Sequence, residues 1–167
     1  FTGASSEPFD RLWTLHMLEI FEFPSPWGLN SLVWFGVIGA VALLIGTVTT
    51  WFIRRIFDVD EPRTPRRLLA VINAFLIGST LVFALSGSFA LAVSMVIITS
   101  VLRRISEPIA DVWLIQHTES AYRATIFSLR GQANAFAQVA LGPAMGFLAV
   151  MSTLRTALVG TSTLLTP

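Results

Sequence analysis

Long apolar stretches alternate with short polar ones along this chain of 167 residues. Residues 31–53 hold no charged residue and, at about 1.5 Å per helical residue, are long enough to cross a hydrocarbon core of about 30 Å. Residues 68–86 are also uncharged and end at the tight-turn sequence Ser86-Gly87-Ser88. This pattern predicts an all-α polytopic membrane protein, whose apolar helices cross the bilayer one after another.

The same pattern predicts three further helices. The apolar stretch from Phe89 to Leu102 is too short to cross a bilayer alone, so we expect this helix to continue to residue 114. Residues 126–151 form a predicted fourth span that is rich in small residues. Residues 157–165 are apolar over too short a length to cross, and we expect them to be the start of a fifth span.

The opening segment, 1–24, differs from the rest because charged residues interleave with apolar residues at helical spacing. Its apolar positions are Phe9, Leu12, Trp13, Met17, Ile20 and Phe21. The pattern predicts an amphipathic helix, for which two placements are open. The helix either lies in the membrane interface or is part of a broken span that lines a cavity, with a kink at Pro8.

Composition agrees with lipid as the main solvent, since 54% of the residues are apolar, 13% are charged and the mean hydropathy is +0.72. We expect one membrane domain over residues 1–167. A net charge of +1 does not support a nucleic-acid partner, which requires a clustered basic face. The absence of cysteine excludes disulfides, thiolate metal sites and a cysteine nucleophile.

Basic residues indicate the orientation of the predicted helices. Five of the eleven arginines lie in the predicted loop 54–67, and Arg123 lies in the predicted connector 116–125, whereas the opposite loops carry only Arg155. Because cytoplasmic loops are enriched in basic residues, we expect 54–67 and 116–125 to be cytoplasmic.

Four polar residues of the third span, Ser100, Arg104, Glu107 and Asp111, lie within about 60° of one another on one helix face. A charge near the bilayer centre costs about 2.5–3.5 kcal/mol, so such residues pair, face water or lie near the interface. Arg104 can pair with Glu107 at i,i+3, which leaves one carboxylate over. Two interpretations are open: the charges lie at the cytoplasmic interface, or they form a cavity-facing ion site where repulsion and burial favour protonation of one carboxylate.

The fourth span carries amides and then small residues. Asn134 and Gln138 share a face, and we weigh hydrogen bonding between helices equally against contact with a solute. Gly142 and Gly146 form a small-xxx-small pattern, for which close helix packing is the better interpretation.

No motif of an enzyme or a metal site is present. His16 and His117 are separated by several predicted helices and belong to no HExxH or similar pattern, so we expect no metal site and no cofactor. No GxSxG sequence and no phosphate-binding glycine loop occur in the chain. We therefore expect a protein that is not an enzyme.

Several segments resemble bacterial transporters of the major facilitator superfamily. Residues 123–128 (RATIFS), 131–135 (GQANA) and 142–146 (GPAMG) are similar to helix eleven of that family, and 104–108 (RISEP) is similar to helix ten. Residues 7–13 (EPFDRLW), together with His16, are similar to the outer end of helix seven. Arg130 adds a charge to helix eleven that departs from the family pattern.

The resemblance implies that this chain is the incomplete C-terminal half of a transporter, from late helix seven (1–24) through helices eight (31–53), nine (68–86), ten (89–114) and eleven (126–151) to early helix twelve (157–165). It implies partners as well: the lipid bilayer, a small-molecule substrate, protons and the missing N-terminal half. Helices seven and ten would then face the central path, which favours a cavity for Asp10 and its neighbour Arg11, and for Arg104, Glu107 and Asp111.

The function that follows is proton-coupled secondary transport of a small solute, of the efflux type, by alternating access in a bacterial plasma membrane. The alternative is a membrane scaffold or anchoring protein that does not transport.

Overall fold

The computed structural model describes the backbone of residues 2–24, 30–56 and 63–151, with most side chains between Phe9 and Ala140. Helices make up nearly all of this part of the chain, and it contains no strand, which confirms the predicted all-α class. The elements are α1 (Thr2–Ile20), α2 (Ser31–Ile56), α3 (Arg63–Leu85), α4 (Phe89–Gln116), the short 3-10 helix η2 (Ser120–Tyr122) and α5 (Arg123–Met151).

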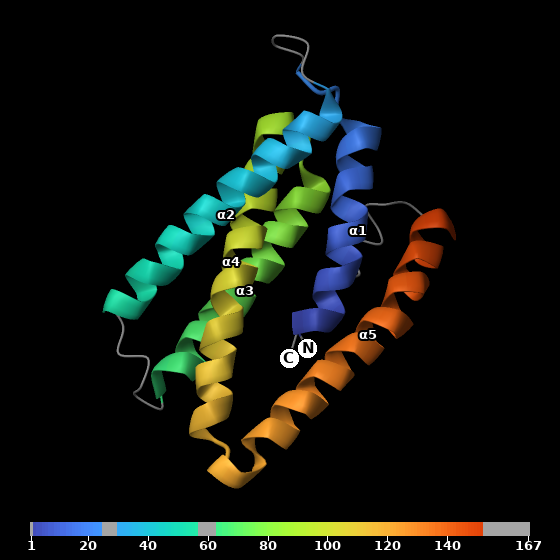
Figure 1. Cartoon of the computed structure of the whole chain (residues 1–167). Coiled ribbons are helices and arrows are strands. Elements are labelled where there is room, and N and C mark those ends of the chain that lie inside the picture. The colour runs from blue at the N-terminus through green and yellow to red at the C-terminus, as the bar shows by residue number, and fades with distance from the viewer. Residues whose placement is uncertain (1, 25–29, 57–62, 152–167) are drawn as a thin grey trace.

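Helix α4 occupies the middle of the arrangement. It packs along α3 on one side and against α2 on another, while α1 contacts both α4 and α5 (Figure 1). The chain turns at η2, and α5 then runs back beside α1. The C-terminal end of α2 and the N-terminal end of α3 lie at the same end of the molecule, which we call the arginine end because Arg55, Arg66 and Arg67 are exposed there.

Three of the helices are long and apolar enough to cross a membrane. These segments are Ser31–Ile53 in α2, Thr64–Leu85 in α3 and Phe89–Gln116 in α4, with mean hydropathies of 2.2, 2.3 and 1.7. They indicate a membrane-embedded protein, as the sequence predicted. Only 17% of the most apolar part of α2 is buried inside the structure, so most of its apolar surface faces outward. The predicted start of another span at 157–165 lies outside the described residues.

Helix ends differ from the predicted ones at the polar connections. Helix α2 continues to Ile56 and α3 begins at Arg63, so residues 54–56 and 63–67 of the predicted loop 54–67 are helical. Likewise α4 ends at Gln116 and α5 begins at Arg123, which shortens the predicted connector 116–125. Hydropathy marks where a helix leaves an apolar environment, whereas arginine is a good helix former and proline is tolerated in a first turn. Pro65 accordingly lies in the first turn of α3.

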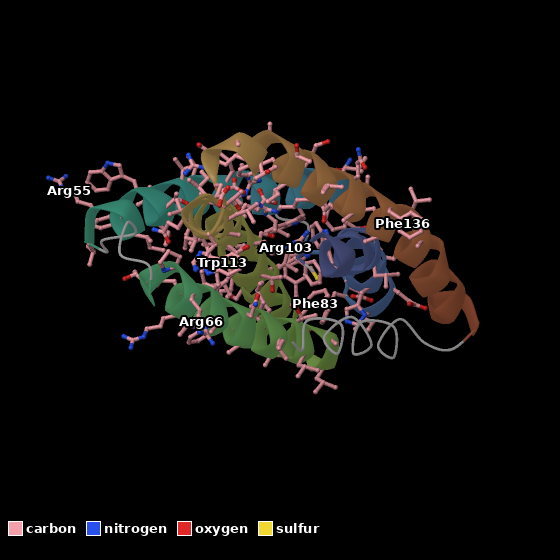
Figure 2. All side chains as sticks on the ribbon, turned by 90° about the horizontal axis from the view of Figure 1, so that it is seen from below. Arg55, Arg66, Phe83, Arg103, Trp113 and Phe136 are labelled. Atoms are coloured by element: carbon pink, nitrogen blue, oxygen red, sulfur yellow. The ribbon has the colours of Figure 1, made fainter. Side chains whose placement is uncertain are left out.

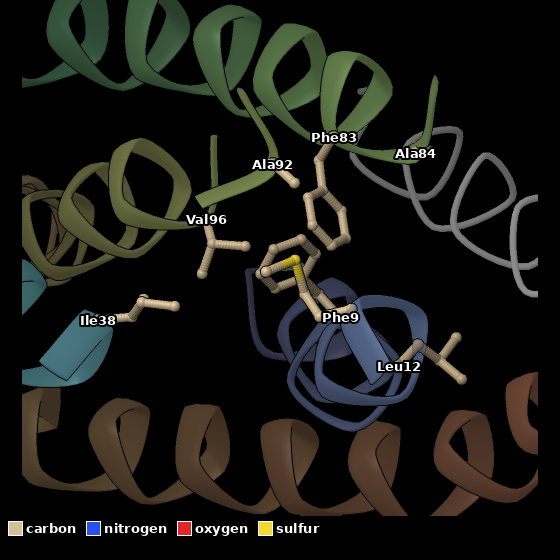
Figure 3. Packing of buried hydrophobic residues seen from close by; sticks show 8 residues of the cluster. Phe9, Leu12, Ile38, Phe83, Ala84, Ala92 and Val96 are labelled. Carbon is tan, nitrogen blue, oxygen red and sulfur yellow. The ribbon is translucent and has the colours of Figure 1, made fainter. Parts of the chain in front are cut away.

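The main core cluster joins α1 to α3 and α4. Phe9 and Met17 of α1 pack with Phe83 of α3 and Val96 of α4, all at most 3% exposed (Figure 3). The rings of Phe9 and Phe83 meet edge to face at a centroid separation of 5.6 Å. The apolar side of amphipathic α1 is therefore packed within the helix bundle, and α1 is helical through Pro8.

A buried hydrogen-bonded pair fixes α4 against α3. The Thr99 hydroxyl of α4 donates to Ser79 Oγ at 2.9 Å, and the Ser79 hydroxyl donates to the Leu76 carbonyl oxygen at 3.1 Å. Both side chains are buried, so each hydroxyl needs a partner there. Successive residues of a helix are rotated by about 100° around its axis. Because Thr99 faces α3, Glu107 and Asp111 therefore lie on a side of α4 that is about 80–120° away from α3.

The core cluster predicts that truncating two phenylalanines of α3 lowers the free energy of unfolding by different amounts. Truncating Phe83, which is fully buried, by Phe83→Ala should cost at least about 1.5 kcal/mol. This is below the roughly 3–5 kcal/mol of water-soluble cores because lipid and detergent tails solvate an apolar side chain as well as protein does. The free energy of unfolding is measured in mixed micelles by tryptophan fluorescence.

Phe75→Ala is the matched control, since Phe75 lies on the same helix but is 62% exposed. Its cost should stay below about 0.5 kcal/mol. Equal costs for the two substitutions would mean that Phe83 is not in a packed core.

Candidate functional site

The polar stripe of α4 lies in the half of the helix that follows its most apolar turns. At about 1.5 Å per residue, Arg104, Glu107 and Asp111 lie about 22, 27 and 33 Å along the axis from Phe89. In a helix that crosses about 30 Å of hydrocarbon from Phe89, Arg104 lies inside the far boundary and Asp111 lies beyond it. Arg104 and Glu107 are exposed, and Asp111 is partly buried.

Arg104 faces α2, where a glycine makes room for it. A Cβ atom built on Gly46 would lie 3.0 Å from Arg104 Cδ, so a side chain at position 46 would press on the stem of the arginine. Next to this contact is an open pocket of about 390 Å³, which is lined by Gly46, Thr47, Thr50, Trp51 and Arg104.

Asp111 faces α5 and forms an ion pair with Arg130 across the α4–α5 connection. The pair is moderately accessible, since the Arg130 side chain is 36% exposed and that of Asp111 is 46% exposed. Arg130 is thus the partner that holds one carboxylate of the stripe.

Arg104 and Glu107 are spaced so that they can pair at i,i+3, but no ion pair between them is formed in the structure. An exposed i,i+3 pair gains only about 0.2–0.5 kcal/mol, which is too little to hold the guanidinium away from the space beside Gly46. Glu107 is the carboxylate left over, because none of the described residues forms an ion pair or hydrogen bond with it.

Arg103 takes a different direction from its neighbour. Its guanidinium lies over the ring of Phe9 on α1, 5.7 Å from the centroid, and Figure 2 shows it in the interior between α4 and α1. A cation over an aromatic face is stabilised by the ring quadrupole. Adjacent arginines of α4 therefore face two different helices.

The other predicted site residues are not brought to this stripe by any described contact. On α5, Asn134 is exposed and Gln138 is partly buried, and neither forms a hydrogen bond with a described residue. The two interpretations of these amides, hydrogen bonding between helices and contact with a solute, therefore both stay predictions. The side chains of Asp10 and Arg11, and the surroundings of Gly142 and Gly146, lie outside the described residues, so these four remain predictions.

Comparison with protein-family models, with curated proteins and with solved structures finds no match to this chain. The function of the protein is therefore inferred from the residues of this chain and their geometry.

Neither histidine belongs to a metal-binding arrangement in the described residues, where no group of three or more potential ligands comes together. His16 is buried against the ring of Phe83, with centroids 5.0 Å apart. His117 directly follows α4 as its C-cap residue, where its ring stacks on Trp113 and its Nδ1 lies 2.8 Å from the Trp113 carbonyl oxygen. These contacts give both imidazoles packing roles.

The Asp111–Arg130 pair can be recognised in the sequence, although not from hydropathy. In a helical hairpin, residues at equal distances from the turn lie at the same level. Asp111 and Arg130 are nearly equidistant from η2. Opposite charges at such positions indicate a contact across the hairpin.

The exposure of this pair predicts a small coupling energy. A double-mutant cycle with Asp111→Asn and Arg130→Gln should give about 0.2–1 kcal/mol, because solvent screens a half-exposed pair. The unfolding free energies of the four proteins in mixed micelles measure it.

A cycle that pairs Asp111→Asn with Arg123→Gln serves as control and should give no coupling. The Arg123 guanidinium donates instead to the backbone oxygens of Thr118 and Ile115 at 3.3 and 3.4 Å. Zero coupling for Asp111 with Arg130 would show that the pair contributes nothing to the folded state.

Proposed function

We propose that this chain is part of a multi-pass carrier of the major facilitator type, which moves a small solute across a membrane with proton coupling and alternating access. The observation that carries this proposal is the polar stripe of α4. A helix apolar enough to cross a membrane carries Glu107 without a partner in the described residues and Asp111 in an ion pair with a different helix. Ionisable residues in apolar helices are costly, and they are typical of ion and substrate pathways.

Proton coupling would act through the link between α4 and α5. A proton that binds to Asp111 neutralises the carboxylate, which removes its attraction for Arg130. Helix α5 is then held mainly by its packing against α1, because that is its extensive contact in the described residues. A carrier of this kind needs a second helical bundle, so that the two bundles can rock about a site at their interface. We therefore propose an N-terminal bundle as the partner.

This mechanism predicts that both carboxylates of the stripe are needed for coupled transport. The whole carrier is expressed in cells, and the accumulation of a panel of small solutes that includes ethidium is measured with and without an uncoupler. We expect Glu107→Gln and Asp111→Asn each to reduce uncoupler-sensitive transport at least tenfold.

Glu119→Gln is the matched control, since Glu119 is an exposed carboxylate at the start of η2. It should transport like the unaltered protein. Full coupled transport by both stripe variants would exclude the proton pathway, and the absence of uncoupler-sensitive transport by the unaltered carrier would favour a scaffold.

The proposed topology predicts opposite accessibility of two exposed turns. The chain contains no cysteine, so single cysteines can be introduced by Gly87→Cys in the α3–α4 turn and by Glu119→Cys before η2. A Cβ at Gly87 meets no atom within 4 Å, so the first substitution fits. With the arginine end cytoplasmic, a membrane-impermeant maleimide should label Gly87→Cys in intact cells and Glu119→Cys only after permeabilisation. Labelling of both in intact cells would contradict this orientation.

A further inference from the structure

The pocket between α2 and α4 has a charged side chain on an outward-facing surface. Arg104 is the charged member of its lining, and it has no ion-pair partner in the described part of the chain. Thr47 and Trp51 of α2 are exposed beside it. The pocket is thus an open, positively charged site on the exposed surface of α2 and α4.

The position of the pocket along the helices places it near a lipid headgroup layer. Gly46 and Arg104 each lie 15 residues after the first residue of their helices, Ser31 and Phe89. Both are therefore about 22 Å along a crossing of about 30 Å, within reach of the boundary for a long arginine side chain. The next turn of α2 carries Arg55 over the ring of Trp51, 5.0 Å from its centroid, and tryptophan is typical of the interface.

The polar atoms of the pocket define the ligand chemistry. The Thr47 and Thr50 hydroxyls donate to the carbonyl oxygens of Leu43 and Gly46 at 2.9 and 2.8 Å, so their own oxygens are left to accept hydrogen bonds. Arg104 only donates and carries a positive charge. A matching ligand combines an anionic group with hydroxyl donors.

The surface beyond the pocket fits an acyl chain. From Thr47, the face of α2 that continues away from the arginine end presents Leu43, Ala40 and Gly36, all exposed. Gly36 has nothing within 4 Å of a built Cβ, so this track is open. An apolar track that leads from a cationic pocket near the interface has the layout of a lipid site.

We propose that this pocket binds the headgroup of an acidic glycerophospholipid of the phosphatidylglycerol class. Its phosphodiester would accept hydrogen bonds from Arg104, its glycerol hydroxyls would donate to the threonine oxygens, and one acyl chain would lie along α2. The site depends on membrane residence and not on transport.

Native mass spectrometry of the whole protein in detergent tests the site with phosphatidylglycerol, phosphatidylcholine and glycerol 3-phosphate as probes. Phosphatidylglycerol should bind more tightly than phosphatidylcholine, and glycerol 3-phosphate should not compete at the same concentration, because it lacks acyl chains. Arg104→Gln should weaken phosphatidylglycerol binding about fivefold or more, since one arginine near an anionic surface is worth about 1 kcal/mol.

Two further variants keep the test decisive. Thr50→Val keeps the shape of the side chain and leaves the charge of the pocket unchanged, but it removes one hydrogen-bond acceptor. It should weaken phosphatidylglycerol binding with little effect on phosphatidylcholine. Arg66→Gln removes the same charge at an exposed position of α3, away from the pocket. It should leave the affinity for phosphatidylglycerol nearly unchanged. Equal losses for Arg66→Gln and Arg104→Gln, equal affinity for the two lipids, or competition by glycerol 3-phosphate would overturn the proposal.

Discussion

A hydrocarbon environment offers no solvent for a charge, and this constraint determines how the second half of α4 is surrounded. A charge at the bilayer centre costs about 2.5–3.5 kcal/mol, which is a large part of the stability of a small bundle. Each charge of α4 that lies near that environment therefore needs a partner or a path to the interface. Arg103 meets an aromatic ring of α1, Arg104 meets the pocket at α2, and Asp111 meets Arg130 of α5. The charges of α4 thus face three different helices, which is possible because α4 lies in the middle of the arrangement.

The contacts on the two sides of α4 differ in strength. Toward α3, the interface includes the buried Thr99–Ser79 hydrogen bond, and an unpaired hydroxyl there would cost about 1–3 kcal/mol. Toward α5, the described link is one half-exposed ion pair, which is worth about 0.2–1 kcal/mol. A conformational change that separates α5 from α4 therefore costs much less than one that separates α3 from α4. This asymmetry agrees with a carrier in which α4 stays with α3 while α5 shifts.

Sequence patterns identified the helices well and their partners poorly. The uncharged stretch 31–53 lies within α2, and the helical spacing of Phe9 and Met17 matches the buried face of α1. Spacing along one helix tells which residues share a face, but the helix that this face meets depends on how the whole bundle packs. Gly46 has no sequence signal as the neighbour of Arg104, since its role is only to leave space. The hairpin partner Arg130 could have been found from its distance to the turn.

The structure divides the polar stripe into two sites with different surroundings. Spacing alone places Arg104, Glu107 and Asp111 on one face, for which a location at the interface and a cavity-facing ion site were both open. Asp111 lies seven residues after Arg104, which is about 10 Å farther along the helix. The rotation between them is about 20° short of two full turns, so they stay on nearly the same face. Over that distance the neighbour changes from α2 to α5, because α2 leads away from α4 while α5 approaches α4 near η2 (Figure 1). Arg104 then belongs to an outward pocket suited to an anionic headgroup, and the carboxylates belong to the proposed proton pathway. Under the two proposals, one stripe would bind a lipid headgroup at one level of the helix and carry protons at another.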